Sequence, residues 1–159
     1  MLINLNNHTF GTVAARKPVI SATVAGATRS LNETESGSLI LLDRAAGCVV
    51  TLPVFTVPGV YFDFMVPTTV TSNSYKIITG AGTELLVGDL TNDDVDTSNA
   101  TILWPAEVAS SFIAITMNGT TTGGLIGTRV RVTSLNSTKW MIEGNIKGNG
   151  TVATPLATS

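Results

Sequence analysis

Residues 39–82 read LILLDRAAGCVVTLPVFTVPGVYFDFMVPTTVTSNSYKIITGAG. This stretch contains four short apolar runs separated by Gly-, Pro- and Asn-containing turns, at 39–42, 48–52, 59–66 and 74–79. Runs of this length between turn residues are typical of β-strands joined by hairpins or short loops. The third run is the clearest, because Val60, Phe62, Phe64 and Val66 alternate with Tyr61, Asp63 and Met65. This period of two predicts a strand with one buried face.

The rest of the chain continues the same pattern. Further strands are predicted at 19–24, 28–31, 84–87, 101–104, 110–118, 125–133 and 138–146. Apolar residues nowhere recur at helical spacing over a helix length, and no repeat of fixed period is present, so a solenoid is not expected. We therefore expect an all-β, single-domain antiparallel β-sandwich, jelly-roll-like, over residues 19–146. Residues 1–18 are expected to form an extended N-terminal arm, 88–100 a polar loop, and 147–159 an extended C-terminal tail.

The composition is that of a folded chain with an unusually neutral surface. Hydrophobic residues make up 43% of the 159 residues, whereas charged residues make up 13%, about half the usual share. A surface poor in charge suits a subunit that is covered by its neighbours. A small β-domain with a neutral polar surface has the same composition, so this alternative stays open.

Several classes of function find little support. The net charge is −2, and Arg16 and Lys17 are the only adjacent basic pair, so binding to nucleic acid is not expected. The single Cys48 excludes an internal disulfide framework, and we expect it to be a buried structural thiol. No secretory signal and no apolar stretch of membrane-spanning length is evident.

Residues for catalysis are also scarce. His8 is the only histidine, and no nucleophile elbow or phosphate-binding loop accompanies it. Asp63 could be a single acid in a cleft, but glycoside hydrolysis needs a second carboxylate at a defined separation. We therefore do not expect an enzyme, and we expect no cofactor.

One loop could bind calcium. Side-chain oxygens alternate along the polar loop, at Asp94, Asp96 and Ser98. Calcium prefers such oxygen ligands, although this loop lacks the central Gly and the terminal Glu of an EF-hand. A solvated acidic loop is the ordinary interpretation.

Contacts with a partner are expected from two regions. The N-terminal arm carries interleaved apolar residues and could add a strand to a neighbour's sheet, although a frayed terminus would look the same. The predicted strand 110–118 is apolar on both faces. The predicted strand 125–133 carries Arg129 and Arg131, the only two basic residues of the chain at alternating positions. The residues expected to interact are Leu2, Ile3, Leu5, Phe10, Phe112, Arg129 and Arg131.

The order of several strand and turn segments resembles that in a known class of proteins. The segments are DRAAG at 43–47, VVTLP at 49–53, an aromatic strand that begins at Gly59, TSNSYKIIT at 71–79, KWMIEG at 139–144 and GNGT at 148–151. Together they cover about residues 36–152 and are similar to capsid decoration, or cement, proteins of tailed bacteriophages.

The resemblance implies a structural protein of the virion, made in the host cytoplasm. It would bind the major capsid protein on the outside of the head as a homotrimer and stabilise the shell by non-covalent contacts. Similar segments occur in phage tail and fibre modules. The alternative is therefore a tail or fibre module that recognises a host-surface carbohydrate. Trp104, Trp140 and Tyr75 could then form a platform for sugar stacking, although the alternation of Trp140 with Ile142 favours a core position.

Overall fold

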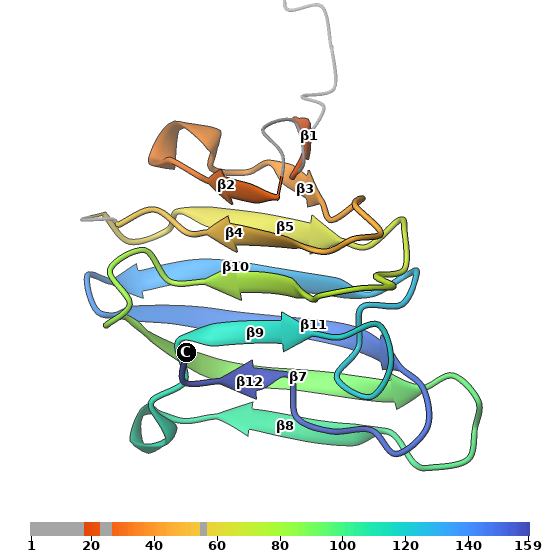
Figure 1. Cartoon of the computed structure of the whole chain (residues 1–159). Coiled ribbons are helices and arrows are strands. Elements are labelled where there is room, and N and C mark those ends of the chain that lie inside the picture. Colours follow the sequence, from red (N-terminus) through yellow and green to blue (C-terminus); the bar gives the residue numbers. More distant parts are fainter. Residues whose placement is uncertain (1–17, 23–26, 55–56) are drawn as a thin grey trace, which may run out of the picture.

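The computed structural model describes residues 18–22, 27–54 and 57–159. Two β-sheets lie face to face, with β1 to β6 at one end of the stack and the hairpin β10–β11 between β5 and β7 in the middle of the larger sheet (Figure 1). The prediction of an all-β fold is confirmed, because the helical elements of the described residues are two 3₁₀ turns, η2 (Glu33–Glu35) and η3 (Val108–Ser110). No described helix has the length and apolar character needed to span a membrane. The expected N-terminal arm lies outside the described residues, apart from Pro18.

Most strands form where the apolar runs predict them. Their bounds are β1 Val19–Ser21, β2 Thr28–Ser30, β3 Leu39–Leu41, β4 Cys48–Thr51, β5 Tyr61–Met65, β6 Tyr75–Ile78, β7 Leu85–Asp94, β8 Ile102–Ala106, β9 Ala114–Met117, β10 Arg129–Asn136, β11 Lys139–Gly148 and β12 Leu156–Ala157. The seven-stranded sheet has the order β1-β3-β5-β10-β11-β7-β8. The five-stranded sheet has the order β12-β9-β6-β4-β2.

The first half of the chain winds as a coil between the two sheets. Strands β1 to β6 alternate from one sheet to the other, and each of β1 to β4 pairs in parallel with the strand two places further along the chain. The expectation of a purely antiparallel sandwich is therefore wrong: both sheets are mixed, and a jelly roll is not confirmed. The paired residues of this coil are unequally spaced along the sequence: Val19 pairs with Leu39, Leu39 with Asp63, and Cys48 with Tyr75. Connections of different length hide the coil from a search for a fixed period.

The second half of the chain completes the larger sheet. The hairpin β10–β11 enters between β5 and β7, antiparallel to β5 and parallel to β7. Strand β7 pairs with β11 over its whole length, from Leu85 with Lys139 to Asp94 with Gly148. Residues 88–94, predicted as part of a polar loop, are therefore strand. Their polar side chains find partners across the ladder: Asn145 Nδ2 donates to Asp93 Oδ2 at 2.7 Å, and Lys147 Nζ lies 3.6 Å from the same oxygen.

The core fills the space between the two sheets. The buried face predicted for the third apolar run is confirmed, since Val60, Phe62, Phe64 and Val66 are all buried. Trp140 on β11 is fully buried and packs against Phe62, with 6.5 Å between ring centroids. Burial of apolar surface is the main favourable contribution to folding, and large aromatic side chains such as these bury the most area per residue.

The C-terminal segment belongs to the sandwich. Residues 147–159 are the expected extended C-terminal tail; in the structure β11 continues to Gly148, and β12 pairs with β9. The buried side chain of Asn92 on β7 fixes the connection between them, because its Nδ2 donates to Thr121 O at 3.1 Å and to Ala153 O at 3.4 Å. The segment is therefore held by contacts within its own chain.

Gly88 allows β7 and β11 to approach one another. Its φ of +120° is a conformation that L side chains rarely adopt, and a Cβ there would lie 2.2 Å from Ile142 O. Gly82 also has a positive φ, +68°, but a Cβ at that position would meet nothing within 4 Å. Comparing the two positions separates backbone strain from steric collision.

We expect Gly88→Ala to lower the free energy of unfolding much more than Gly82→Ala. The matched Gly82 variant carries only the cost of a positive φ, about 1–2 kcal/mol, whereas the Gly88 variant must also separate two paired strands. Urea unfolding followed by tryptophan fluorescence measures both. Equal destabilisation of the two variants would contradict a close approach at Gly88.

Candidate functional site

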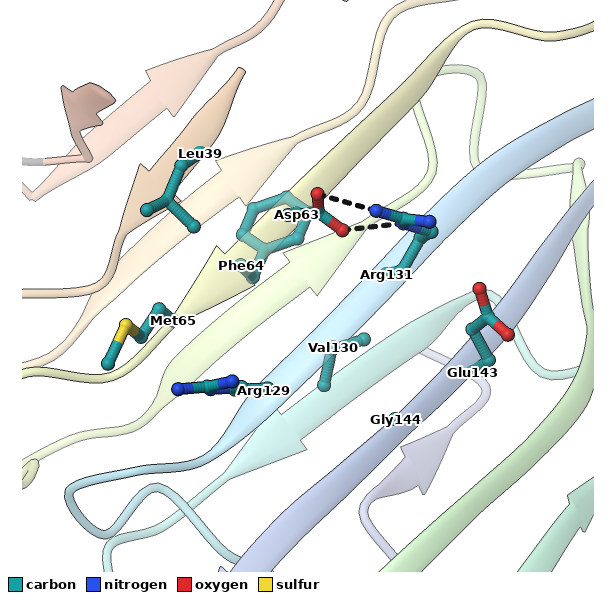
Figure 2. A pocket seen from close by; sticks show the side chains of 9 residues that line it. All are labelled: Leu39, Asp63, Phe64, Met65, Arg129, Val130, Arg131, Glu143 and Gly144. Carbon is teal, nitrogen blue, oxygen red and sulfur yellow. Dashed lines mark hydrogen bonds and ion pairs between the residues drawn. The ribbon is translucent and has the colours of Figure 1, made fainter. Parts of the chain in front are cut away.

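A hollow of about 580 Å³ lies on the outer face of the seven-stranded sheet (Figure 2). It spans strands β3, β5, β10 and β11, which are consecutive in the sheet. Its volume is in the range of sites that bind small molecules. The lining residues are Leu39, Asp63, Phe64, Met65, Arg129, Val130, Arg131, Glu143 and Gly144.

The register of the four strands arranges the outward side chains in two rows. One row crosses the sheet as Leu39, Asp63, Arg131 and Glu143, and the next as Leu41, Met65, Arg129 and Asn145. Side chains in such cross-strand positions contact one another. The hollow therefore has the apolar Leu39 and Met65 on β3 and β5, next to the charged Asp63 on β5 and the charged residues of β10 and β11.

An ion pair forms the middle of the first row. Arg131 Nε donates to Asp63 Oδ1 at 2.6 Å, and Arg131 Nη2 donates to Asp63 Oδ2 at 2.9 Å. The guanidinium carbon also lies 5.3 Å from the centroid of the Tyr61 ring. Two parallel hydrogen bonds and a cation–π contact hold the guanidinium in one orientation. Although such an exposed pair adds little to stability, it fixes the shape of the hollow.

The other two charged residues of the hollow remain unpaired among the described residues. Arg129 and Glu143 are both exposed, and neither side chain makes a hydrogen bond or ion pair with another described residue. In Figure 2, Arg129 extends toward Met65 on β5, whereas Glu143 stands on the β11 side. One positive and one negative group are thus available to a partner at different places of one hollow.

The structure brings together only some of the residues expected to interact. Arg129 and Arg131 line the same hollow, whereas Phe112 is half-buried and packs against the core. Leu2, Ile3, Leu5 and Phe10 lie outside the described residues. Glu143, Leu39 and Met65 were missed, because only strand register places them beside the arginines. The alternation of Glu143 with the buried Ile142 was the one signal that it faces outward.

The predicted calcium residues form a compact loop closed by hydrogen bonds. Asp94 Oδ2 accepts from Asn99 N at 2.7 Å and from Ser98 Oγ at 3.0 Å. Asp96 Oδ1 accepts from Ser98 N at 2.9 Å, and Asp96 Oδ2 accepts from Gly150 N at 3.1 Å. These carboxylates serve as acceptors for the amides and hydroxyl of their own loop. Among the described residues no cluster of three or more His, Cys, Asp or Glu could hold a metal ion.

The aromatic residues considered for sugar stacking do not share a surface. Trp140 and Tyr75 are fully buried, and Tyr75 Oη donates to Thr68 O at 2.8 Å. Trp104 on β8 is half-buried and packs against the core. Burial likewise raises the pKa of the Cys48 thiol to about 11, so this cysteine is neutral and unreactive at physiological pH, as expected for a structural thiol.

Comparison of the sequence with protein-family models and with curated proteins finds no match. The residues of the chain itself are the evidence for its function. Two features stand out among them: the hollow with its unpaired charges, and the self-contained acidic loop.

We expect Asp94→Ala to destabilise the protein by about 1–3 kcal/mol, because several donors of the loop lose their shared acceptor. Asp89 lies on the same strand but is exposed, so Asp89→Ala is the matched control and should change stability by less than about 0.5 kcal/mol. Urea unfolding of both variants measures the difference. A tolerated Asp94→Ala would show that the loop needs no acceptor at this position.

The same loop should open in acid. Hydrogen bonds from the hydroxyl and the amide of Ser98 lower the pKa of Asp96 from its usual 3.8 to about 2. The stabilising contribution of a carboxylate with a lowered pKa is complete above the usual value and is lost as the pH falls through the lowered one. We expect the amide resonances of Ser98 and Gly150 to shift with a midpoint near pH 2 in an NMR titration. A midpoint near pH 3.8 would contradict these hydrogen bonds. An Asp96→Asn variant whose Ser98 and Gly150 resonances titrate like those of the parent protein would contradict them too.

Proposed function

We propose that this protein is a structural component of a tailed-bacteriophage particle, a decoration protein that binds the outside of the head. Its partner would be the major capsid protein, and its assembled form a homotrimer at the virion surface. The proposal follows from the resemblance of residues 36–152 to decoration proteins. It is supported by the all-β sandwich that these residues form.

The observation that carries the proposal is a surface that is poor in charge and exposes large apolar side chains. Charged residues make up only 13% of the chain, and several large apolar side chains are more than half exposed. These are Val19, Val54, Val57, Leu103 and Ile126. A surface of this kind is poorly suited to a free monomer at high concentration, whereas burial against neighbours removes its apolar area from water.

The mechanism would be stabilisation by mass action. A protein that binds only the expanded shell shifts the equilibrium toward that state, because every occupied site adds its binding free energy. At a free concentration of about 100 times Kd, each site contributes about 2.7 kcal/mol. Many such sites on one shell resist internal pressure without any covalent bond.

The alternative of a carbohydrate-binding tail or fibre module receives no specific support. It would need exposed aromatic residues in one place, and the buried Trp140 and Tyr75 cannot supply them. We therefore take the decoration protein as the better proposal.

Two measurements test this proposal. We expect light scattering of the purified protein to give the mass of a trimer across a range of concentrations. We also expect co-sedimentation with expanded shells, but not with unexpanded ones, and a higher disruption temperature for the decorated shells. A monomer that binds shells would contradict the trimer alone. Failure to bind any form of the shell would overturn the assignment as a decoration protein.

A further inference from the structure

We infer that Asn149 is a site of chemical modification, at which the side-chain amide is converted to a carboxylate after attack by the next backbone nitrogen. The chain contains two Asn-Gly pairs, Asn118–Gly119 and Asn149–Gly150. Glycine has no side chain to hinder its backbone nitrogen, so both pairs are chemically susceptible. The folded structure restrains the first pair and leaves the second open, whether or not the protein belongs to a phage particle.

The reaction closes a succinimide ring between neighbouring residues. Gly150 N loses its proton to hydroxide and forms a bond to Asn149 Cγ. The bond from Cγ to the side-chain nitrogen breaks, and this nitrogen takes a proton from water and leaves as ammonia. Water then opens the ring at either carbonyl carbon. The products are aspartate, with an ordinary backbone, and isoaspartate, whose backbone runs through the side-chain carbon. Only water is consumed.

The side chain of Asn118 is held at both of its polar atoms. Its Oδ1 accepts from Thr120 N at 2.9 Å, from Thr120 Oγ1 at 3.1 Å and from Thr122 N at 3.1 Å. Its Nδ2 donates to Thr121 Oγ1 at 3.1 Å. Ring closure requires the face of the amide carbon to turn toward Gly119 N. That turn withdraws Oδ1 and Nδ2 from these partners, so the fold protects Asn118.

The side chain of Asn149 has no such restraint. It is exposed, and it makes no hydrogen bond with another described residue. The backbone of the same residue is fixed, because Asn149 N donates to Thr120 O at 3.1 Å. The amide carbon is therefore free to turn toward Gly150 N, and water can reach it.

The two attacking nitrogens are restrained to a similar degree. Gly119 N donates to Gly123 O at 2.7 Å, and Gly150 N donates to Asp96 Oδ2 at 3.1 Å. Each nitrogen must give up one hydrogen bond before it attacks. Asp96 is a weak base, since hydrogen bonds from Ser98 hold its pKa at about 2, so the proton goes to hydroxide and not to this carboxylate. The difference between the two sites therefore lies in the asparagine side chains.

Isoaspartate at position 149 would disturb the connection between β11 and β12. Asn99 Nδ2 donates to Gly150 O at 3.0 Å, and Gly150 N donates to Asp96 Oδ2. The additional backbone carbon of isoaspartate moves Gly150 away from both partners. Aspartate with an ordinary backbone adds a negative charge and leaves these contacts in place. We therefore expect the isoaspartyl product to be the less stable of the two.

The test compares both sites in one sample, since each Asn-Gly pair is followed by threonine. The purified protein is kept in mildly alkaline buffer for several weeks. Digests are then analysed by chromatography and mass spectrometry for aspartate and isoaspartate at positions 118 and 149. We expect Asn149 to react about tenfold faster than Asn118 or more, because the four hydrogen bonds of Asn118 must open first. In concentrated urea, where the fold is lost, the two sites should react at similar rates.

Variants assign the reaction to these side chains. Asn149→Gln should remove the main product, because glutamine must close a larger ring. Thr120→Ala combined with Thr121→Ala removes two hydroxyl partners of Asn118, and should speed its reaction about two- to fivefold while Asn149 reacts as in the parent protein. Equal rates at the two sites of the folded protein, a faster reaction at Asn118, or no reaction at Asn149 would overturn the inference.

Urea unfolding checks the effect on the backbone. Aged protein should unfold at a lower urea concentration than freshly prepared Asn149→Asp, which carries the same added charge on an ordinary backbone. Equal unfolding midpoints would contradict the expected loss of the Gly150 contacts.

Discussion

The parallel ladder between β7 and β11 is the interaction on which the rest of the structure depends. It joins strands β7 and β8 to the hairpin β10–β11 over the full length of β7 and β11, and the hairpin in turn pairs through β10 with β5 of the coil. Gly88 permits the close approach, and the contacts of Asp93 with Asn145 and Lys147 add polar links along the outer face. Such non-local pairing is costly in chain entropy, so it forms only when the whole sandwich buries its core.

This ladder also sets the geometry of the hollow. Because β11 is fixed by β7, and β10 lies between β11 and β5, the outward side chains of three distant segments come into register. Asp63 and Glu143 then flank Arg131 in one row, and the bidentate pair goes to Asp63. The unpaired charges of the hollow are thus a consequence of strand order, since one arginine has two carboxylate neighbours and contacts only one of them.

Two groups of acidic residues among those described illustrate opposite uses of a carboxylate. In the 94–99 loop the oxygens of Asp94 and Asp96 accept hydrogen bonds from their own loop and from Gly150, so the charge stabilises local structure. In the hollow, Glu143 contacts no described donor. The carboxylates of the loop are therefore already engaged, whereas that of Glu143 is open to solvent.

The sequence by itself determined the all-β class, the place of most strands and the buried faces, including Trp140 and the third apolar run. Those features depend on short-range patterns, because a period of two and turn residues act within about ten residues. It did not reveal β7, where polar residues 88–94 become strand through pairing with β11, nor the coil, whose turns differ in length. It identified Arg129 and Arg131 but not Glu143, Leu39 and Met65 beside them. Only the tertiary structure decided these points, because strand order and register depend on contacts between residues far apart in the chain, for which a local pattern carries no signal.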